Sequence, residues 1–142
     1  MEYNMKGSDF SHPSLKLAGN KQLVYTAISK HYFYYRMHIS QYVLQQEMVP
    51  LNPFMLFDYF LLDSIDRDLV RDANNALILR ADQIWIFGPI SNGVLAEIML
   101  AKKVAKPIKY FALIKPHKIV PINEEVVVME DEVQQFHELL SK

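Results

Sequence analysis

The chain has 142 residues, with 15 Lys and Arg against 16 Asp and Glu, a net charge of -1 and no cysteine. This length indicates one domain with a sizeable core, and the lack of cysteine excludes disulfides, thiolate zinc sites and a cysteine nucleophile. The four glycines, at 7, 19, 88 and 93, do not form a dinucleotide-binding or Walker-type phosphate loop. The balanced charge gives no overall positive charge that would attract nucleic acid.

Residues 1–20 are mixed and polar, which predicts a loose tail or surface arm ahead of one folded domain at residues 21–142. This stretch has no basic segment followed by an apolar one, so it does not resemble a secretory signal. No part of the chain approaches the roughly 18 uninterrupted apolar residues of a membrane-spanning helix. We therefore expect a cytoplasmic protein with no membrane partner.

Short β-branched and aromatic runs predict buried strands, while longer runs with regularly spaced polar residues predict helices. The predicted strands are 23–28, 48–51, 83–87 and 107–113, with a last one at 126–129. The predicted helices are 32–46, 66–81, 91–105 and 131–140, and residues 54–62 form a short helix or ordered loop. Asp63 or Ser64 is the expected cap of the second helix, and Ser91 that of the third.

The alternation of strands and helices predicts an α/β fold with a parallel sheet covered on both faces. In such sheets a ligand lies beyond the carboxyl ends of the strands, where the strand order reverses. In this chain that place corresponds to the residues after Ile28 and after Phe87.

Glu97 is a single acid in an otherwise apolar stretch of predicted helix. The residues three and four positions away share its face, and they are Gly93, Val94, Leu100 and Ala101. An unpaired carboxylate on an apolar face is costly, so such a residue either has partners or serves in chemistry. The alternative is that this face reaches solvent near the helix N-terminus, where the helix dipole favours an acid.

Two further residues fall near the same predicted pocket. Ser91 lies at the strand-to-helix turn, where free N–H groups, a hydroxyl and the nearby Gly93 make a natural anion site; a plain N-cap is the alternative. Tyr25 on the first strand could hydrogen-bond a carboxylate, and ordinary core packing is its alternative.

Several short segments occur in a distinctive order. They are VYTA at residues 24–27, ADQIWIFG at 81–88, SNGVLAE at 91–97, alanine at 101 and KPI at 106–108. In order and spacing they resemble the nucleoside 2-deoxyribosyltransferase superfamily, particularly its 2'-deoxynucleoside 5'-phosphate N-hydrolase branch and small uncharacterised members. The likeness extends from about Leu23 to Phe111.

This resemblance implies a flavodoxin-like or Rossmann-like three-layer sandwich with a four- to five-stranded parallel sheet. It implies an enzyme, an N-glycosidase or deoxyribosyltransferase, that cleaves or transfers the N-glycosidic bond of a 2'-deoxynucleoside or its 5'-monophosphate. No cofactor or metal ion is implied. Because family members commonly assemble and share their pockets, a homo-oligomer is expected.

The resemblance also implies roles for individual residues. The glutamate that matches Glu97 is the family's nucleophile, and the tyrosine that matches Tyr25 hydrogen-bonds and orients it. A serine in the place of Ser91 contacts the 5'-phosphate in the N-hydrolase branch, which favours a phosphorylated substrate here. The other expected substrate-binding residues are Ser29, Asn74, Gly88, Asn92 and Gly93.

The chain departs from the family at two positions. The family acid that contacts the base and assists its departure lies eight residues ahead of the position of Asp82, where this chain has Asn74. Asp72 lies roughly 200° around the helix from that position and is a poor substitute. The glycine that commonly follows the first strand is Ile28 here, with Ser29 beside it. Asp82 itself is interpreted as a turn or cap residue.

Other features suggest less specific roles. The five histidines show no spacing typical of a metal site. The aromatic residues 32–35 could stack a base and Arg36 could meet a phosphate, with core packing or a subunit contact as the alternative. The acids at 124–125 and 130–132 are interpreted as solvated surface and a helix start. Because of Asn74, the alternative function is a non-catalytic nucleotide-binding or sensor domain; a partner-binding domain with an empty pocket is a third hypothesis.

Overall fold

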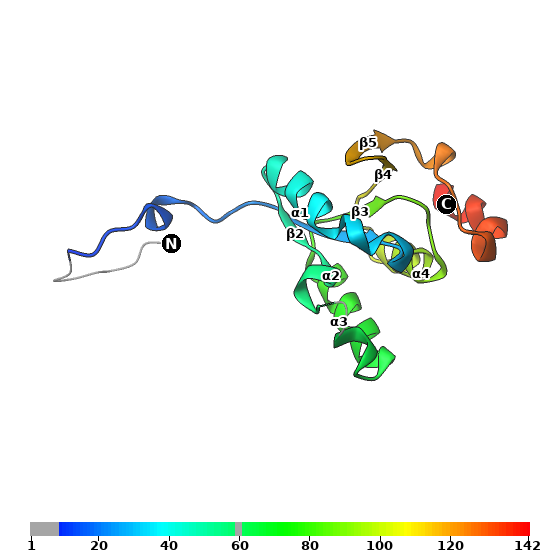
Figure 1. Cartoon of the computed structure of the whole chain (residues 1–142), viewed down its shortest axis with the longest axis horizontal. Helices are drawn as coiled ribbons and strands as arrows, with labels where there is room; N and C mark the ends of the chain where they lie inside the picture. The colour runs from blue at the N-terminus through cyan, green and yellow to red at the C-terminus, as the bar shows by residue number, and fades with distance from the viewer. Residues whose placement is uncertain (1–8, 59–60) are drawn as a thin grey trace.

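A five-stranded sheet forms the centre of the computed structural model, which describes residues 9–58 and 61–142 (Figure 1). The strands are β1 (Leu23–Ile28), β2 (Val49–Leu51), β3 (Gln83–Phe87), β4 (Ile108–Ile114) and β5 (Lys118–Ile122). Their order is β2-β1-β3-β4-β5. The first four strands are parallel, and β5 pairs with β4 in the antiparallel direction.

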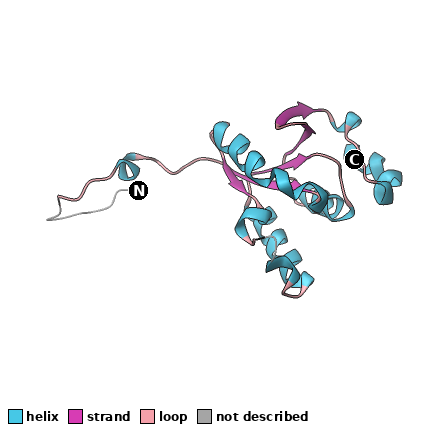
Figure 2. Cartoon of the chain, viewed as in Figure 1, coloured by secondary structure: helices cyan, strands magenta, loops and turns pink. Residues whose placement is uncertain are grey.

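Helices occupy the connections between the parallel strands, and a short turn joins β4 to β5 (Figure 2). The α-helices are α1 (Arg36–Gln45), α2 (Pro53–Leu56), α3 (Arg67–Arg80) and α4 (Asn92–Lys103). The 3-10 segments are η1 (Pro13–Lys16), η2 (Lys30–Tyr35), η3 (Leu61–Asp63), η4 (Glu124–Val126) and η5 (Asp131–Ser141). Within the described residues, no helix has both the length and the apolar character needed to cross a membrane.

The sheet buries both of its faces, because side chains alternate along each strand. Tyr25 and Ala27 of β1 face one core, which α3, α4 and the C-terminal segment complete. Val24 and Ile28 face the other core, which α1 covers. The predicted fold class, a flavodoxin-like three-layer α/β sandwich, is confirmed.

The edges of the predicted elements need several corrections. The helix expected at 32–46 begins as the 3-10 segment η2 and becomes α-helical only at Arg36. Asp66, rather than Asp63 or Ser64, caps α3, since its side chain accepts the hydrogen bond of the Asp68 N–H. The segment at 131–140 is 3-10 helical rather than α-helical.

The last strand was predicted in the wrong place. The fifth strand is β5, and residues 126–129 instead form the end of η4 and an isolated bridge between Met129 and Ile90. Pro121 lies inside β5, and a proline within an apolar run normally counts against a strand. It is tolerated here because β5 is the edge strand and pairs on one side only.

Residues 9–22 are exposed and extend away from the sheet in Figure 1. The short segment η1 in this arm is capped by His12, whose ring accepts the Ser14 N–H. The first eight residues of the predicted tail lie outside the described residues.

Gly88 ends β3 in a conformation that only glycine adopts without strain, with a φ of 75°. A Cβ there would lie 2.9 Å from Leu113 Cδ1. We expect Gly88→Ala to lower the free energy of unfolding by about 1–3 kcal/mol, from backbone strain and the displaced leucine. Urea unfolding of the two proteins measures this difference.

Gly93→Ala is the matched control, since nothing lies within 4 Å of an added Cβ and the residue is helical. Alanine in a helix is favoured over glycine by up to about 1 kcal/mol. A loss of stability in Gly93→Ala equal to that in Gly88→Ala would contradict this account.

Candidate active site

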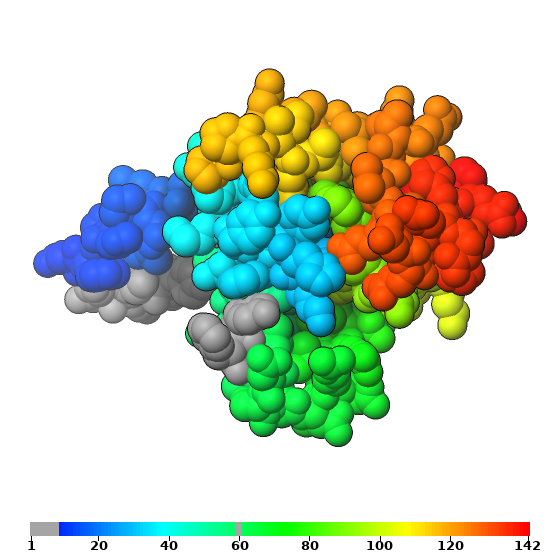
Figure 3. All heavy atoms as spheres, turned by 45° about the vertical axis from the view of Figure 1, so that its right-hand side comes forward, coloured from blue at the N-terminus to red at the C-terminus, as the bar shows by residue number. Residues whose placement is uncertain are grey.

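A cavity of about 560 Å³ opens beside the carboxyl ends of β1 and β3. This is the place where the strand order reverses, because β1 and β3 are neighbours in the sheet while β2 and β4 lie on their outer sides. The cavity is lined by the segment after β1, by α2, α3 and the start of α4, and by two acids near the C-terminus. In Figure 3 the segment after β1, the green α3 region and the red C-terminal segment lie on one face of the molecule.

Glu97 and Tyr25 are in direct contact in the lining of this cavity. The Tyr25 hydroxyl donates a hydrogen bond to Glu97 Oε2. Tyr25 is fully buried on β1, and Glu97 projects from α4 on the same side of the sheet. The contact therefore joins the sheet to the helix and holds a carboxylate at the cavity.

Burial changes the proton affinity of both groups. Loss of hydration raises the pKa of Glu97 to about 7, and the hydrogen bond from Tyr25 opposes this rise. Burial and the neighbouring Glu97 charge raise the pKa of Tyr25 well above 10. Near neutral pH the tyrosine therefore stays a donor, while Glu97 is present in both charged and neutral forms. A carboxylate of this kind can act as a nucleophile or as a base.

The N-terminus of α4 is already in contact with a carboxylate. Ser91 is the N-cap, and its Oγ accepts the Val94 N–H at 3.3 Å. The Asn92 N–H donates to Glu132 Oε1, also at 3.3 Å. Ser91, Asn92 and Gly93 all line the cavity, so a ligand anion at this turn would meet the Glu132 charge.

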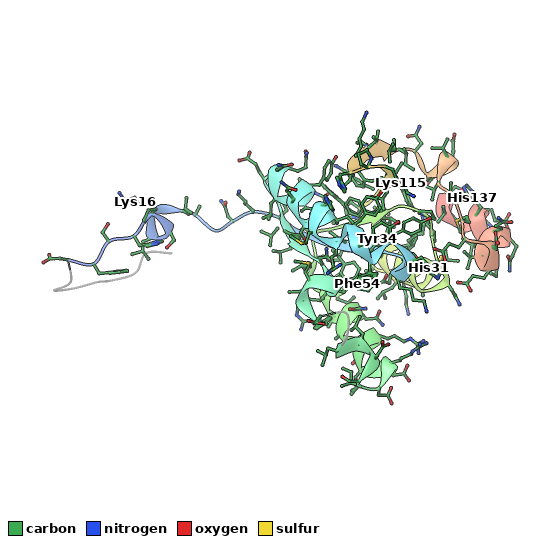
Figure 4. The ribbon with its side chains drawn as sticks, viewed as in Figure 1. Lys16, His31, Tyr34, Phe54, Lys115 and His137 are labelled. Atoms are coloured by element: carbon green, nitrogen blue, oxygen red, sulfur yellow. The ribbon has the colours of Figure 1, made fainter. Side chains whose placement is uncertain are left out.

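Ser29 lies directly after β1, is almost completely buried and lines the cavity. Its Oγ accepts the His31 N–H, and this starts η2. His31 Nδ1 lies 3.3 Å from Glu130 Oε1, so the C-terminal segment meets the segment after β1 beside the cavity. Figure 4 labels His31 and Phe54, both of which line the cavity.

The sequence interpretation of the C-terminal acids as solvated surface was incomplete. Glu130 and Glu132 both line the cavity, and each contacts another segment of its wall. Sequence position offered no signal for this, because these acids lie more than thirty residues beyond Glu97.

Helix α3 contributes four polar residues, three of which were not predicted. Asn74 was expected at the site, and it lines the cavity together with Arg67, Arg71 and Asn75. Their spacing places all four on one helix face, which is a signal that the sequence contained. Asp72 is exposed and is not part of the lining, in line with its position around the helix.

Gly88 and Asp82 lie apart from this group. Gly88 does not line the cavity, and its N–H donates to Phe111 O at the end of the β3 and β4 pair. Asp82 Oδ2 accepts the Leu23 N–H at 2.8 Å, so this residue ties the start of β1 to the turn before β3.

Residues 25–111 match the model of a family described as a domain of unknown function, DUF7768. The chain belongs to this family. The matched region of DUF7768 runs from Tyr25 to Phe111 and includes Glu97. No curated protein matches the chain.

A solved structure of a 2-desoxiribosyltransferase from Leishmania mexicana is similar to this DUF7768 chain in fold. The two are 15% identical, the match covers 84% of this chain and 97% of the other, and the TM-score is 0.51. At this identity the likeness establishes a common fold. Among the described residues, no group of three or more His, Asp or Glu side chains is placed to hold a metal ion.

The raised pKa of Glu97 predicts a pH-dependent cost to stability. The folded chain holds this proton up to a pH of about 7, whereas the ordinary glutamate value is 4.5. The free energy of unfolding should therefore fall as the pH rises from about 4.5 to about 7, on the order of 3 kcal/mol in total. Glutamine does not titrate, so this loss should be absent in Glu97→Gln. The free energy of unfolding of the variant minus that of the wild type should therefore be higher at pH 8 than at pH 5. Urea unfolding at the two pH values measures the effect.

Glu138→Gln is the control, because Glu138 is exposed and does not line the cavity. Its stability difference from the wild type should not change with pH. If Glu97→Gln behaved in the same way as this control, Glu97 would have an ordinary pKa.

Proposed function

We propose that this chain cleaves or transfers the N-glycosidic bond of a 2'-deoxynucleoside or its 5'-monophosphate, with Glu97 as the nucleophile. The observation that carries the proposal is the half-buried Glu97 carboxylate, held by the Tyr25 hydroxyl in the lining of the cavity. The family model and the shared fold are compatible with this chemistry, and the 2-desoxiribosyltransferase of similar fold supports it.

In the proposed reaction, a Glu97 oxygen attacks C1' of the sugar. The C1'–N bond breaks and its electron pair leaves with the base, through a transition state with positive charge on the sugar. A carboxylate stabilises that charge more strongly in a water-poor site than in water. The resulting glycosyl ester is resolved at C1' by water, which gives hydrolysis, or by a second base, which gives transfer.

Tyr25 has a positioning role in this proposal. Its hydroxyl fixes one Glu97 oxygen and favours the charged form, and the other oxygen is left for attack. Ser29, Asn74, Ser91, Asn92 and Gly93 line the same cavity and are the proposed substrate contacts. Gly88 shapes the turn after β3 without lining the cavity.

Purified protein incubated with 2'-deoxynucleosides and with their 5'-monophosphates should release free base, measured by chromatography. Glu97→Ala should reduce release by at least about 1,000-fold because no nucleophile remains. The rate should rise with pH through about 7 as Glu97 loses its proton. Glu138→Gln should retain the wild-type rate.

Base release that survives Glu97→Ala would refute Glu97 as the nucleophile. Stabilisation by these compounds in thermal unfolding without any base release would instead support the nucleotide-sensor function, which Asn74 favours because an amide cannot protonate a departing base.

The position of Glu132 predicts how the chain discriminates between substrates. A 5'-phosphate at the α4 N-terminus would compete with the Glu132 carboxylate for the Asn92 N–H. Glu132→Gln should therefore raise kcat/KM for a deoxynucleoside 5'-monophosphate about 5- to 10-fold relative to the free deoxynucleoside, through loss of like-charge repulsion. If the ratio of the two kcat/KM values did not change in Glu132→Gln, the phosphate would bind elsewhere.

A further inference from the structure

Helix α1 lacks the charged outer side of an ordinary surface helix. Residues 37–46 contain no Asp, Glu, Lys or Arg, although 22% of the whole chain is charged. Ile39 and Val43 on its inner side are buried in the core against the sheet. A surface helix normally carries charged and polar side chains opposite its buried face, whereas a helix that is apolar all round is covered all round. The composition of α1 therefore indicates a second contact on its outer side.

Apolar side chains are exposed on that outer side. Met37 is 66% exposed and Leu44 is 57% exposed. Spacings of three and four residues place Met37, Gln41 and Leu44 on one face of the helix. Tyr34, which lies three positions before Met37 in η2, is 50% exposed. Tyr34, Met37 and Leu44 are named here the outer face of α1, and they form an apolar stripe that is exposed in the single chain.

The N-terminal arm, residues 9–22, also carries exposed apolar side chains. All of its residues are exposed, and Leu17 is 74% exposed. The N–H groups of Leu15 and Leu17 donate to carbonyl oxygens three residues earlier, so the short segment η1 is held by hydrogen bonds within the arm. Figure 4 shows Lys16 of this arm well away from Tyr34. The arm therefore presents two leucines outside the core of its own chain.

The chain exposes more surface than a compact monomer of its mass. Its accessible surface is 9635 Å², whereas a folded monomer of 16.6 kDa exposes about 7,600 Å². The excess of about 2,000 Å² is larger than the roughly 800 Å² that each partner buries in a standard interface. The surface needed for a stable association is therefore present, and the exposed arm supplies part of it.

The position of Gln22 fixes where the arm leaves the body. Its carbonyl oxygen accepts the Val49 N–H at 2.9 Å, so the arm starts beside β2, the strand that follows α1 in the chain. The seven residues from Gln22 to Leu15 reach at most about 25 Å when extended. Helix α1 has 10 residues and is about 15 Å long. The arm is therefore long enough to reach the α1 of a neighbouring copy.

We propose that the arm of one copy packs Leu15 and Leu17 against the outer face of α1 of a second copy, in a two-fold dimer with exchanged arms. Reciprocal exchange closes the assembly at two copies, because each arm and each outer face is then used once. Covering this part of α1 removes no charged side chain from water, so it avoids the desolvation cost of burying charge.

This proposal is independent of the Glu97 chemistry. None of Leu15, Leu17 and the residues of the outer face lines the cavity. It names a surface for the homo-oligomer that the sequence led us to expect, and it is tested by the association of the chain rather than by its activity.

Sedimentation of the full chain over a range of concentrations measures the association. The wild type should be a dimer at micromolar concentrations. Leu15→Ser combined with Leu17→Ser should raise the dissociation constant at least about 100-fold, because two apolar side chains lose their buried environment. Met37→Gln combined with Leu44→Gln should do the same. All four residues are exposed in the single chain and glutamine is a good helix former, so both variants should fold, which circular dichroism verifies.

Leu79→Gln is the matched control. Leu79 is 49% exposed on α3 and lines no part of the cavity. This variant removes an exposed apolar side chain of the same size as Leu44 from another helix, so its dissociation constant should equal that of the wild type.

The absence of cysteine allows a direct test of the exchange. Leu17→Cys and Met37→Cys are introduced separately into two chains of different mass, which are mixed and oxidised. A disulfide between positions 17 and 37 of different chains should form, and peptide mass spectrometry identifies it. The mixture of Leu17→Cys with Leu79→Cys should give no disulfide between positions 17 and 79. In a chain with both Leu17→Cys and Met37→Cys, the disulfide should join two chains.

Three results would overturn the proposal. The first is a wild type that stays monomeric throughout the micromolar range. The second is a dimer that withstands either pair of substitutions, or that Leu79→Gln weakens equally. The third is a disulfide between positions 17 and 37 that forms only within one chain, since the arm would then fold back onto its own α1.

Discussion

The contact between the Tyr25 hydroxyl and Glu97 is the interaction on which the site depends. It places a carboxylate where hydration is poor, and a single donor from the central sheet offsets part of that cost. The same contact fixes α4 against β1, so the packing of the helix on the sheet also sets the position of Glu97 relative to Tyr25. The acid is thereby held on rigid elements rather than on a loop.

The remaining cavity lining extends this arrangement by separating charges. The carboxylates come from α4 and the C-terminal segment, the arginines come from α3, and Ser29 after β1 also lines the cavity. A ligand that enters therefore meets acceptors on one wall and donors on the other. Such a polarised cavity suits a molecule whose two ends differ in chemistry, as the sugar and base of a nucleoside do.

The alternation of buried strands with helices predicted the fold class because a parallel sheet needs both faces covered. The solitary Glu97 and the turn at Ser91 also had local signals, and the structure brings both to one cavity. The mistakes fell where local patterns are weak. Pro121 counted against a strand at 118–122, so the edge strand β5 was not predicted. The bridge at Met129 depends on a distant partner, Ile90.

The sequence by itself determined the four parallel strands, their covering helices and the single acid on an apolar helix, because periodicity and residue type act over a few neighbouring positions. Only the tertiary structure decided that Glu132 reaches Asn92, that Glu130 meets His31, and that the arginines of α3 line the same cavity as Glu97. These contacts join segments distant in sequence. Chain folding sets their distances, and no local pattern of residues encodes them.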